Sequence, residues 1–452
     1  MVSVSGVRGR VGEALTPEIV SRFAAGFGHW AQGRAGASRK IVLGRDSRVS
    51  GPMFHRAVIA ALQSVGAEIV DLGVVPTPTI QLAVEHHHAA GGLGITASHN
   101  PIEWNALKFI GPSGLFLDGS EAREMRAVVE SEFPRVTWDR IGTLTRDDDA
   151  VRRHINAIVA LPFVDVEGIR ARRYHVALDC VRGAGGLFMP ELLERFGCVV
   201  SSINMQPDGR FPRPPEPVAE NLGELEALVK TSGAVVGFAV DPDVDRLALV
   251  SDQGKAIGED YTLALAASVV LGHREGPVVT NLSTSRIVDD VAERAGRTVV
   301  RAPVGEVNVA TRMRSDGAAI GGEGNGGVIL TEMHLGRDAP VGVALILQLL
   351  HQENRSLSAI VADYPSYSIV KDKLDLPRAP LDSVYSSLRT AMSDADVDMQ
   401  DGMRLSWSDR WVHVRPSGTE PIVRVIAEAP TRDEAYALIT AGREAVEKLS
   451  RS

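Results

Sequence analysis

A chain of 452 residues is longer than one compact hydrophobic core usually supports, so its length predicts three or four domains. Its 44% hydrophobic and 23% charged residues are ordinary for a water-soluble protein, and the most apolar stretch, residues 261–271, is far short of the ~20 residues that cross a bilayer. A net charge of −9 argues against nucleic acid as the main partner, and the two cysteines argue against a disulfide framework. We therefore expect a cytoplasmic protein that binds neither membrane nor nucleic acid.

Short β-branched runs alternate with amphipathic helical patterns through most of the chain. In three successive groups, the expected strands and helices are 40–44, 51–65, 68–72 and 89–95; 174–179, 189–196 and 235–240; and 277–280, 287–295 and 298–301. Strands that alternate with helices indicate crossover connections and mainly parallel sheets.

The last part of the chain has a different pattern. Two alternating strands, 411–414 and 422–427, precede a long amphipathic helix at 432–449, which is typical of an α+β domain. We expect three similar α/β domains with mainly parallel mixed sheets and a C-terminal α+β domain, arranged around a central cleft. Polar and Pro-rich breaks place the predicted boundaries so that the domains are 1–150, 151–256, 257–368 and 369–452.

A serine stands in a short polar turn directly after one predicted strand. Residues 96–101 read Thr-Ala-Ser-His-Asn-Pro, and Ser98 follows the apolar run that ends at Ile95. Open parallel sheets bind ligands at the carboxyl ends of their strands, so the Ser98 hydroxyl would face a ligand there. An isolated turn of this kind is more often only a turn, and the functional interpretation depends on the motifs that follow.

Three aspartates alternate after the strand at 235–240. Asp241, Asp243 and Asp245 are flanked by apolar runs on both sides, so an ordinary solvated turn does not explain all three. Carboxylates this close repel one another unless a cation lies between them, and hard oxygen ligands suit Mg²⁺. The segment predicts a divalent-metal site.

Two further loops contain groups suited to a phosphorylated sugar. Residues 322–327 read Gly-Glu-Gly-Asn-Gly-Gly, in which Glu323 and Asn325 are able to pair with sugar hydroxyls, although a Gly-rich loop alone is weak evidence. Residues 415–421 read Arg-Pro-Ser-Gly-Thr-Glu-Pro and lie between two predicted strands. Backbone N–H groups and arginine there could hold a phosphate, and a plain β-turn is the equally weighted alternative.

Two isolated cations also have a functional interpretation. Lys108 lies in an apolar stretch, where a lysine commonly extends to solvent; beside a metal and arginines, its pKa would fall enough for general-base catalysis. Arg8 lies in a glycine-flanked segment, where the alternative is a solvated charge.

The four motifs, in this order, resemble the α-D-phosphohexomutase superfamily from one end of the chain to the other. That superfamily includes phosphoglucomutase, phosphomannomutase and phosphoglucosamine mutase, and its members have three similar α/β domains and a distinct fourth. The chain departs from common family patterns at Asn105-Ala106 after the serine loop, at Gly327 in the sugar loop, and at Pro242 and Val244 in the metal loop.

The resemblance assigns roles to individual residues. It implies that Ser98 is the phosphorylated nucleophile and a metal ligand, with Asp241, Asp243 and Asp245 as the other Mg²⁺ ligands and Lys108 as general acid/base. Catalysis would be assisted by His99, Arg8 and Arg246. Substrate contacts would come from the following residues: Glu323, Asn325, Glu306, Arg415, Ser417, Gly418, Thr419 and Arg424.

The implied reaction is reversible phosphate transfer between the C1 and C6 oxygens of a hexose, with a hexose 1,6-bisphosphate as intermediate or primer. The segment Val304-Gly305-Glu306 looks more like phosphoglucosamine mutases, and Glu306 could face a C2 amino group, so glucosamine 6-phosphate is the expected substrate. Glucose and mannose phosphates are the alternative. A sugar-phosphate phosphatase and a non-catalytic sensor are alternatives of other classes. We expect a monomer or homodimer.

Overall fold

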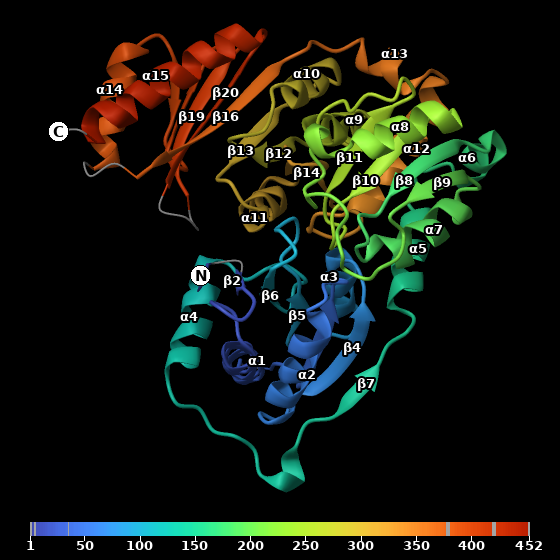
Figure 1. Ribbon diagram of the computed structural model, residues 1–452, viewed down its shortest axis with the longest axis vertical. Coiled ribbons are helices and arrows are strands. Elements are labelled where there is room, and N and C mark those ends of the chain that lie inside the picture. The colour runs from blue at the N-terminus through green and yellow to red at the C-terminus, as the bar shows by residue number, and fades with distance from the viewer. Residues whose placement is uncertain (1, 4–5, 35, 377–379, 418–421, 451–452) are drawn as a thin grey trace.

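The computed structural model describes residues 2–3, 6–34, 36–376, 380–417 and 422–450, which form four β-sheets with their helices (Figure 1). We number the four units by the order of their sheets along the chain. The first unit lies at the bottom of the view in Figure 1, and the fourth unit lies at the upper left, beyond the third.

The first unit is built on a seven-stranded sheet with strand order β1-β2-β6-β5-β3-β4-β7. Its central strands β5, β3, β4 and β7 are parallel, and β6 and β2 join antiparallel at one side. The strands are β1 Val2–Ser3, β2 Gly6–Arg10, β3 Lys40–Arg45, β4 Glu68–Val74, β5 Gly91–Ile95, β6 Trp104–Ile110 and β7 Leu144–Arg146; the helices are α1 Pro17–Gln32, α2 Gly51–Gln63, α3 Thr77–His86 and α4 Gly119–Glu130.

The second and third units each contain a four-stranded mixed sheet, in which one antiparallel edge strand follows a loop with site residues. The orders are β11-β10-β8-β9 and β13-β12-β14-β15. In the second unit the elements are α5 Ala150–Val159, α6 Val166–Arg172, β8 His175–Asp179, α7 Gly185–Arg195, β9 Val199–Ile203, α8 Gly223–Ser232, β10 Val236–Val240 and β11 Leu247–Ser251. In the third they are α9 Asp260–Leu271, β12 Val278–Asn281, α10 Ile287–Arg294, β13 Val299–Ala302, α11 Glu306–Asp316, β14 Ile320–Glu323, β15 Gly327–Leu330, α12 Ala339–Glu353 and α13 Leu357–Val361.

The fourth unit has a five-stranded sheet, in which all the strands are antiparallel, covered by two helices. Its strand order is β16-β20-β19-β18-β17. The elements are β16 Ser368–Asp375, α14 Leu381–Ala391, β17 Asp396–Asp398, β18 Met403–Ser406, β19 Trp411–Pro416, β20 Ile422–Ala429 and α15 Arg432–Ser450. The predicted fold class of three α/β units and a C-terminal α+β unit is confirmed.

The apolar side chains divide the molecule differently from the sheets. One continuous buried cluster runs through the second and third units, from α5 to α13, and includes nearly all of α9 and α12. The first and fourth units have separate clusters of their own. The second and third units therefore share one core, whereas the first and fourth are attached to that core mainly through other contacts.

The Gly-rich segment 322–327 is a hairpin rather than the expected loop. Strand β14 runs on to Glu323, and β15 begins at Gly327 and pairs with it antiparallel. Only three residues are left for the turn, so the glycines allow the two backbones to lie close together: a Cβ at Gly322, where φ is 153°, would lie 2.0 Å from the Gly327 carbonyl oxygen.

Candidate active site

The serine turn follows strand β5, as predicted, and it has a constrained backbone. Ser98 has φ of 49°, in the left-handed region, and its N–H donates to Thr96 Oγ1 at 2.9 Å. The side chain is almost fully buried, and its hydroxyl donates to Asp241 Oδ2 at 2.7 Å. The Ser98 hydroxyl of the first unit thus meets the aspartate loop of the second.

A buried arginine holds the serine turn in shape. The guanidinium of Arg48 donates to four backbone carbonyls, including those of Ser98 at 2.6 Å and Asn100 at 2.7 Å, and it pairs with Asp46 at 3.0 Å. Arg48 is 0% exposed. Because the guanidinium donates to backbone carbonyls of the turn and to the Asp46 carboxylate, it holds the backbone of the turn in place.

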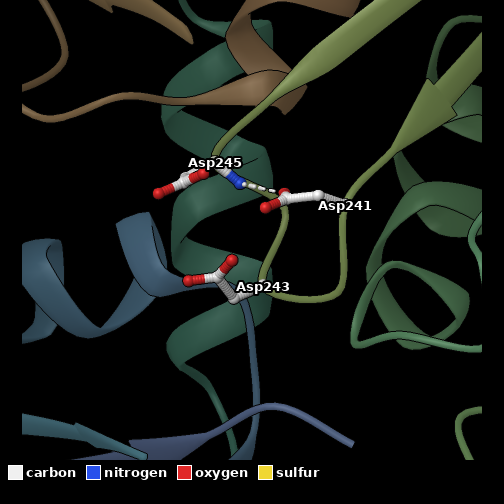
Figure 2. Close-up of side chains that lie close together, drawn as sticks. All are labelled: Asp241, Asp243 and Asp245. Atoms are coloured by element: carbon white, nitrogen blue, oxygen red, sulfur yellow. Dashed lines mark hydrogen bonds between the residues drawn. The ribbon is translucent and has the colours of Figure 1, made fainter. Parts of the chain in front are cut away.

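The three aspartates lie in the turn between β10 and β11 and are all buried. Figure 2 shows their carboxylates on the same side of the turn, and a ligand oxygen from each lies within 4.8 Å of the others. The Asp245 N–H donates to Asp241 Oδ1 at 3.1 Å. Val244 has φ of 61°, which is costly for a β-branched residue, so the turn stores strain where the carboxylates converge.

The surroundings of the aspartates leave oxygens that fit a cation. Lys108 Nζ lies 2.7 Å from Asp243 Oδ2 and 3.5 Å from Asp245 Oδ2. Asp243 Oδ1 and Asp245 Oδ1 are buried without a hydrogen-bond donor from the described residues. Buried acceptor oxygens without a donor are costly, and hard oxygen donors suit Mg²⁺, so the residues present fit such an ion.

The electrostatics of the site at Lys108 depend on two neighbouring carboxylates. Burial alone would lower the pKa of Lys108, but the Asp243 and Asp245 carboxylates outweigh it and raise the pKa. The expected fall in the pKa depends on the charge of a metal ion beside these two carboxylates, so it stays a prediction. Burial and the neighbouring Asp245 and Asp243 charges raise the pKa of Asp241 well above its usual range, whereas Lys108 overcomes burial and lowers that of Asp243.

Three more predicted groups surround Ser98. His99 Nδ1 lies 3.3 Å from Ser98 Oγ, and burial together with nearby arginines lowers the pKa of His99 well below its usual value, so the ring is neutral. Arg8 donates to Asn100 Oδ1 at 2.6 Å. Arg246 pairs with Glu216 at 3.1 Å and lies 4.0 Å from Asp245.

The sugar-loop residues lie on the hairpin of the third unit. Glu323 is buried, with Oε1 accepting from Asn281 Nδ2 at 2.8 Å and from the Gly305 N–H at 3.0 Å. Asn325 Oδ1 accepts from the Gly327 N–H at 3.2 Å, inside the turn. Both residues line the cavity described below.

Glu306, which is expected from the sequence to face the sugar, is a buried carboxylate. It is buried in the first turn of α11, and its Oε2 lies 3.0 Å from Arg337 Nε, while Oε1 accepts from Gln81 at 3.3 Å. Burial raises the pKa of Glu306, although Arg337 opposes this effect.

Arg337 is a central residue of the site that the sequence reasoning missed. Its guanidinium pairs with Asp245 at 2.7 Å, Glu323 at 2.9 Å and Glu306 at 3.0 Å. One buried arginine therefore connects the metal loop with the sugar hairpin. The segment His334-Leu335-Gly336-Arg337 carries no motif that would have identified it. Arg48 was missed for the same reason.

The predicted phosphate loop lies partly outside the described residues. Gly418 and Thr419 are among the residues that are not described, and Ser417 closes β19 with its N–H donating to the Ile422 carbonyl. Arg415 and Arg424 are cross-strand partners on β19 and β20, and Lys373 is the partner of Arg424 on β16. The three cations therefore form a row across one face of the sheet, and the lysine was not predicted.

A cavity of about 1380 Å³ brings the four units together. Its lining includes most of the predicted site residues, but not the three aspartates: Arg8, Ser98, His99, Lys108, Arg246, Glu306, Glu323, Asn325, Arg415 and Arg424. Lys371, Lys373 and Arg432 add further positive charge at the fourth unit. The lining thus holds nine arginines and lysines against six carboxylates, so the acidic protein has a cavity with an excess of cations, suited to a phosphorylated small molecule.

Comparisons with known proteins agree with this architecture. Four phosphoglucomutase/phosphomannomutase family models match in succession: α/β/α domain I at residues 2–135, domain II at 152–254, domain III at 258–367 and the C-terminal domain at 393–443. The chain therefore belongs to the phosphoglucomutase/phosphomannomutase family of the α-D-phosphohexomutase superfamily. Within that class it is an isomerase that resembles the phosphoglucosamine mutases.

Full-length relatives carry two kinds of name. A probable phosphoglucosamine mutase of Methanopyrus kandleri is 37% identical, over 96% of this chain and 95% of that protein. A phosphoglucomutase/phosphomannomutase of Thermococcus kodakarensis is 39% identical, over 98% and 97%. The crystal structure of a putative phosphomannomutase from Thermus thermophilus superposes with a TM-score of 0.83 at 27% identity, covering 99% of both chains.

Within the described part of the chain, no helix is long and apolar enough to cross a membrane.

Proposed function

We propose that this phosphohexomutase interconverts glucosamine 6-phosphate and glucosamine 1-phosphate through a phosphorylated Ser98 and a hexosamine 1,6-bisphosphate. The observation that carries the mechanism is the 2.7 Å hydrogen bond from Ser98 Oγ, a residue of the cavity lining, to Asp241 of the buried aspartate triad. A hydroxyl beside a metal-type carboxylate cluster, facing a cavity with an excess of cations, has the parts that phosphoryl transfer needs.

In this proposal the phosphate on Ser98 passes to the free sugar hydroxyl, and the resulting bisphosphate turns over and returns its other phosphate to Ser98. Mg²⁺ held by Asp241, Asp243, Asp245 and the phosphoserine would neutralise charge on the transferring group. Arg8 and Arg246 line the cavity near Ser98 and add fixed positive charge. Such transition states are loose, so alignment and charge stabilisation supply most of the rate enhancement.

We assign proton transfer to Lys108, with His99 assisting. The attacking sugar hydroxyl must lose a proton, and the Ser98 oxygen must gain one as it leaves. Lys108 lies in the cavity wall beside the aspartates. His99 is neutral, so its ring is able to accept a proton, and its Nδ1 is 3.3 Å from Ser98 Oγ.

The far end of the cavity would hold the phosphate that is not reacting. Arg415 and Arg424 are suited to bidentate phosphate contacts, and Ser417, Gly418 and Thr419 would add hydroxyl and backbone donors. Glu323 and Asn325 would contact sugar hydroxyls at the middle of the cavity. Because the sugar must present first one phosphate and then the other to Ser98, these residues have to accept it in two orientations.

The preference for an amino sugar rests on Glu306 and on the names of relatives. Glu306 lines the cavity, and a carboxylate there would favour a C2 ammonium group over a neutral hydroxyl, although the same carboxylate also pairs with Arg337 at 3.0 Å. Similar proteins include probable phosphoglucosamine mutases, but a phosphoglucomutase/phosphomannomutase is equally similar. Glucose and mannose phosphates are therefore the alternative substrates.

The substrate is tested by comparing kcat/KM for the 6-phosphates of glucosamine, glucose and mannose, with one preparation, Mg²⁺ and the matching 1,6-bisphosphate as primer. We expect the highest value for glucosamine 6-phosphate. A tenfold or greater preference for glucose or mannose, about 1.4 kcal/mol in transition-state binding, would overturn the assignment.

A phosphatase would use the same serine and metal but let water attack the phosphoserine. Incubation with glucose 1-phosphate, following both inorganic phosphate and 6-phosphate, separates the two activities. We expect 6-phosphate with little inorganic phosphate, because four units enclose the cavity. Stoichiometric phosphate release without 6-phosphate would identify a hydrolase, and binding without either product would identify a sensor.

A further inference from the structure

The first half of helix α3 is buried on all sides, which is unusual for a helix that packs on one face of a sheet. The polar residues Thr77, Thr79 and Gln81 are each no more than 1% exposed. Pro78 and Ile80, which lie between them, are buried too. A helix that covers a sheet normally buries one stripe only. Figure 1 shows α3 at the top of the first unit, facing the second and third units.

The polar side chains of this half-helix reach different parts of the molecule. Thr77 Oγ1 donates to Asp243 Oδ2 at 2.6 Å, and the Thr77 N–H donates to the Asp243 carbonyl at 2.9 Å. Thr79 Oγ1 lies 2.9 Å from His154 Nδ1, whose other ring nitrogen is 2.8 Å from Asp338. These contacts join the first unit to the second and third.

Thr77 acts on one oxygen of a predicted metal ligand. Asp243 Oδ2 accepts from both Thr77 and Lys108, whereas Asp243 Oδ1 is buried and has no donor among the described residues. With one oxygen held twice and the backbone also fixed, the carboxylate has little freedom to rotate. The second oxygen, Asp243 Oδ1, is thereby left for the cation. Groups that hydrogen-bond to a metal ligand usually orient it in this way.

We propose that Thr77 is a positioning residue that orients Asp243 for the divalent cation across the interface between the first two units. The proposal rests on the proposed metal site, and it goes beyond it by assigning a role to a residue outside the aspartate loop. Since the hydroxyl that orients Asp243 and the hydroxyl of Ser98 both belong to the first unit, metal binding would also draw the serine turn and the aspartate loop together.

The test is a titration of the full-length protein with Mn²⁺, followed by the loss of the free-ion electron paramagnetic resonance signal. In Thr77→Val, which keeps the shape and removes the hydroxyl, the dissociation constant should rise at least about tenfold. Thr77→Ser should restore the affinity to within about threefold, because it restores the donor.

Thr79→Val is the matched control. This residue is as buried as Thr77 and loses an equivalent hydrogen bond, but it contacts His154 instead of a metal ligand. We expect a lower thermal midpoint and a Mn²⁺ affinity within about twofold of the unmodified protein. Unchanged binding in Thr77→Val, or equal weakening in Thr79→Val, would overturn the inference.

Two further measurements keep the outcomes separate. If Thr77→Val does not fold by circular dichroism, Thr77→Ala is titrated in the same way and must show the same weakening. Asp241→Asn tests the metal site itself: if it binds Mn²⁺ as the unmodified protein does, the proposed metal site fails, whatever the Thr77 variants show.

Discussion

The two ends of the active-site cavity are built in different ways. At the serine end, two buried cations each lie against a buried carboxylate: Lys108 on Asp243 at 2.7 Å, and Arg337 on Asp245 at 2.7 Å. At the opposite end, cations lie beside one another on an antiparallel sheet, with Arg424 between Arg415 and Lys373. One end is neutralised within the protein, and the other carries an excess of positive charge.

This difference follows from what each end has to do. Phosphate transfer needs the nucleophile and the stabilising charges to be aligned within fractions of an ångström, and buried charge pairs provide such alignment. In the proposed function the far end has only to hold a phosphate, and a row of cations would do so without fixing one orientation of the sugar. We therefore expect substitutions at the serine end to reduce kcat and those at the far end to raise KM.

The largest effect is expected for Ser98→Ala. Removal of the nucleophile should lower kcat by a factor on the order of 10⁶, the scale observed when a covalent nucleophile is lost. The rate of conversion of the 6-phosphate can be followed by ³¹P NMR with Mg²⁺ and the bisphosphate present. A variant with near-normal interconversion would contradict the phosphoserine mechanism at its first step.

A large effect on stability is expected for Arg48→Met. Its loss leaves Asp46 as an uncompensated buried charge and frees the carbonyls of the serine turn, so the free energy of unfolding should fall by about 3–5 kcal/mol. Urea unfolding measures this change. Arg56→Met is the control, because Arg56 is an exposed arginine on α2; its change should stay within about 0.5 kcal/mol. Equal effects of the two substitutions would contradict the role given to Arg48.

An acid-sensitive contact is expected where the fourth unit meets the third. His413 Nδ1 lies 2.9 Å from Ser283 Oγ, and burial lowers the pKa of His413 to about 4. An unfolded histidine titrates near 6.5, so the stabilisation is complete above that pH and is lost as the pH falls from 6.5 towards 4. The full loss is about 3 kcal/mol.

This prediction is tested by urea unfolding at pH 7 and pH 5, followed by tryptophan fluorescence. His413→Gln, whose side chain does not titrate, should show a smaller loss between the two pH values than the unmodified protein does. His334, also buried with its pKa lowered to about 4 by burial, remains in both proteins and accounts for part of the residual loss. An identical acid shift in both proteins would exclude His413 as a source.

The smallest effect is expected at the far end, for Arg424→Met. Loss of one charged phosphate contact should raise KM about 10- to 100-fold and leave kcat within about threefold. Steady-state kinetics separate the two constants. Arg443→Met, on α15 of the same unit and outside the cavity lining, should change neither. A fall in kcat at unchanged KM would show that this end also takes part in alignment.

Much of the fold and of the candidate site could be predicted because several candidate site residues directly follow predicted strands. Ser98 follows β5 and Asp241 follows β10, and the position of each after an apolar run is visible in the sequence. The triplet of aspartates between apolar flanks likewise needed no structure to suggest a cation site. Local patterns of this kind are sufficient whenever one strand and its following turn supply the group.

The remaining residues could not be predicted because their roles depend on long-range packing. Thr77 and Asp243 are 166 positions apart, and Arg337 and Asp245 are 92 apart. The hydrophobic pattern of a sequence does not predict which distant loop a buried arginine or threonine will contact. The contacts of Lys108 were missed for a related reason: the sequence shows the apolar strand around the lysine but not the two carboxylates, Asp243 and Asp245, opposite it.

The row of cations on the fourth sheet has a consequence for folding as well as for binding. Like charges directly opposite one another on neighbouring strands repel, so Arg424 beside Arg415 and Lys373 opposes the pairing of these strands. The ion pair of Arg415 with Asp401 at 2.8 Å offsets this effect in part. A bound phosphate would relieve that repulsion, and by thermodynamic linkage it would stabilise the domain as its concentration rises. The phosphate of the substrate would thus act as a counterion that stabilises this sheet.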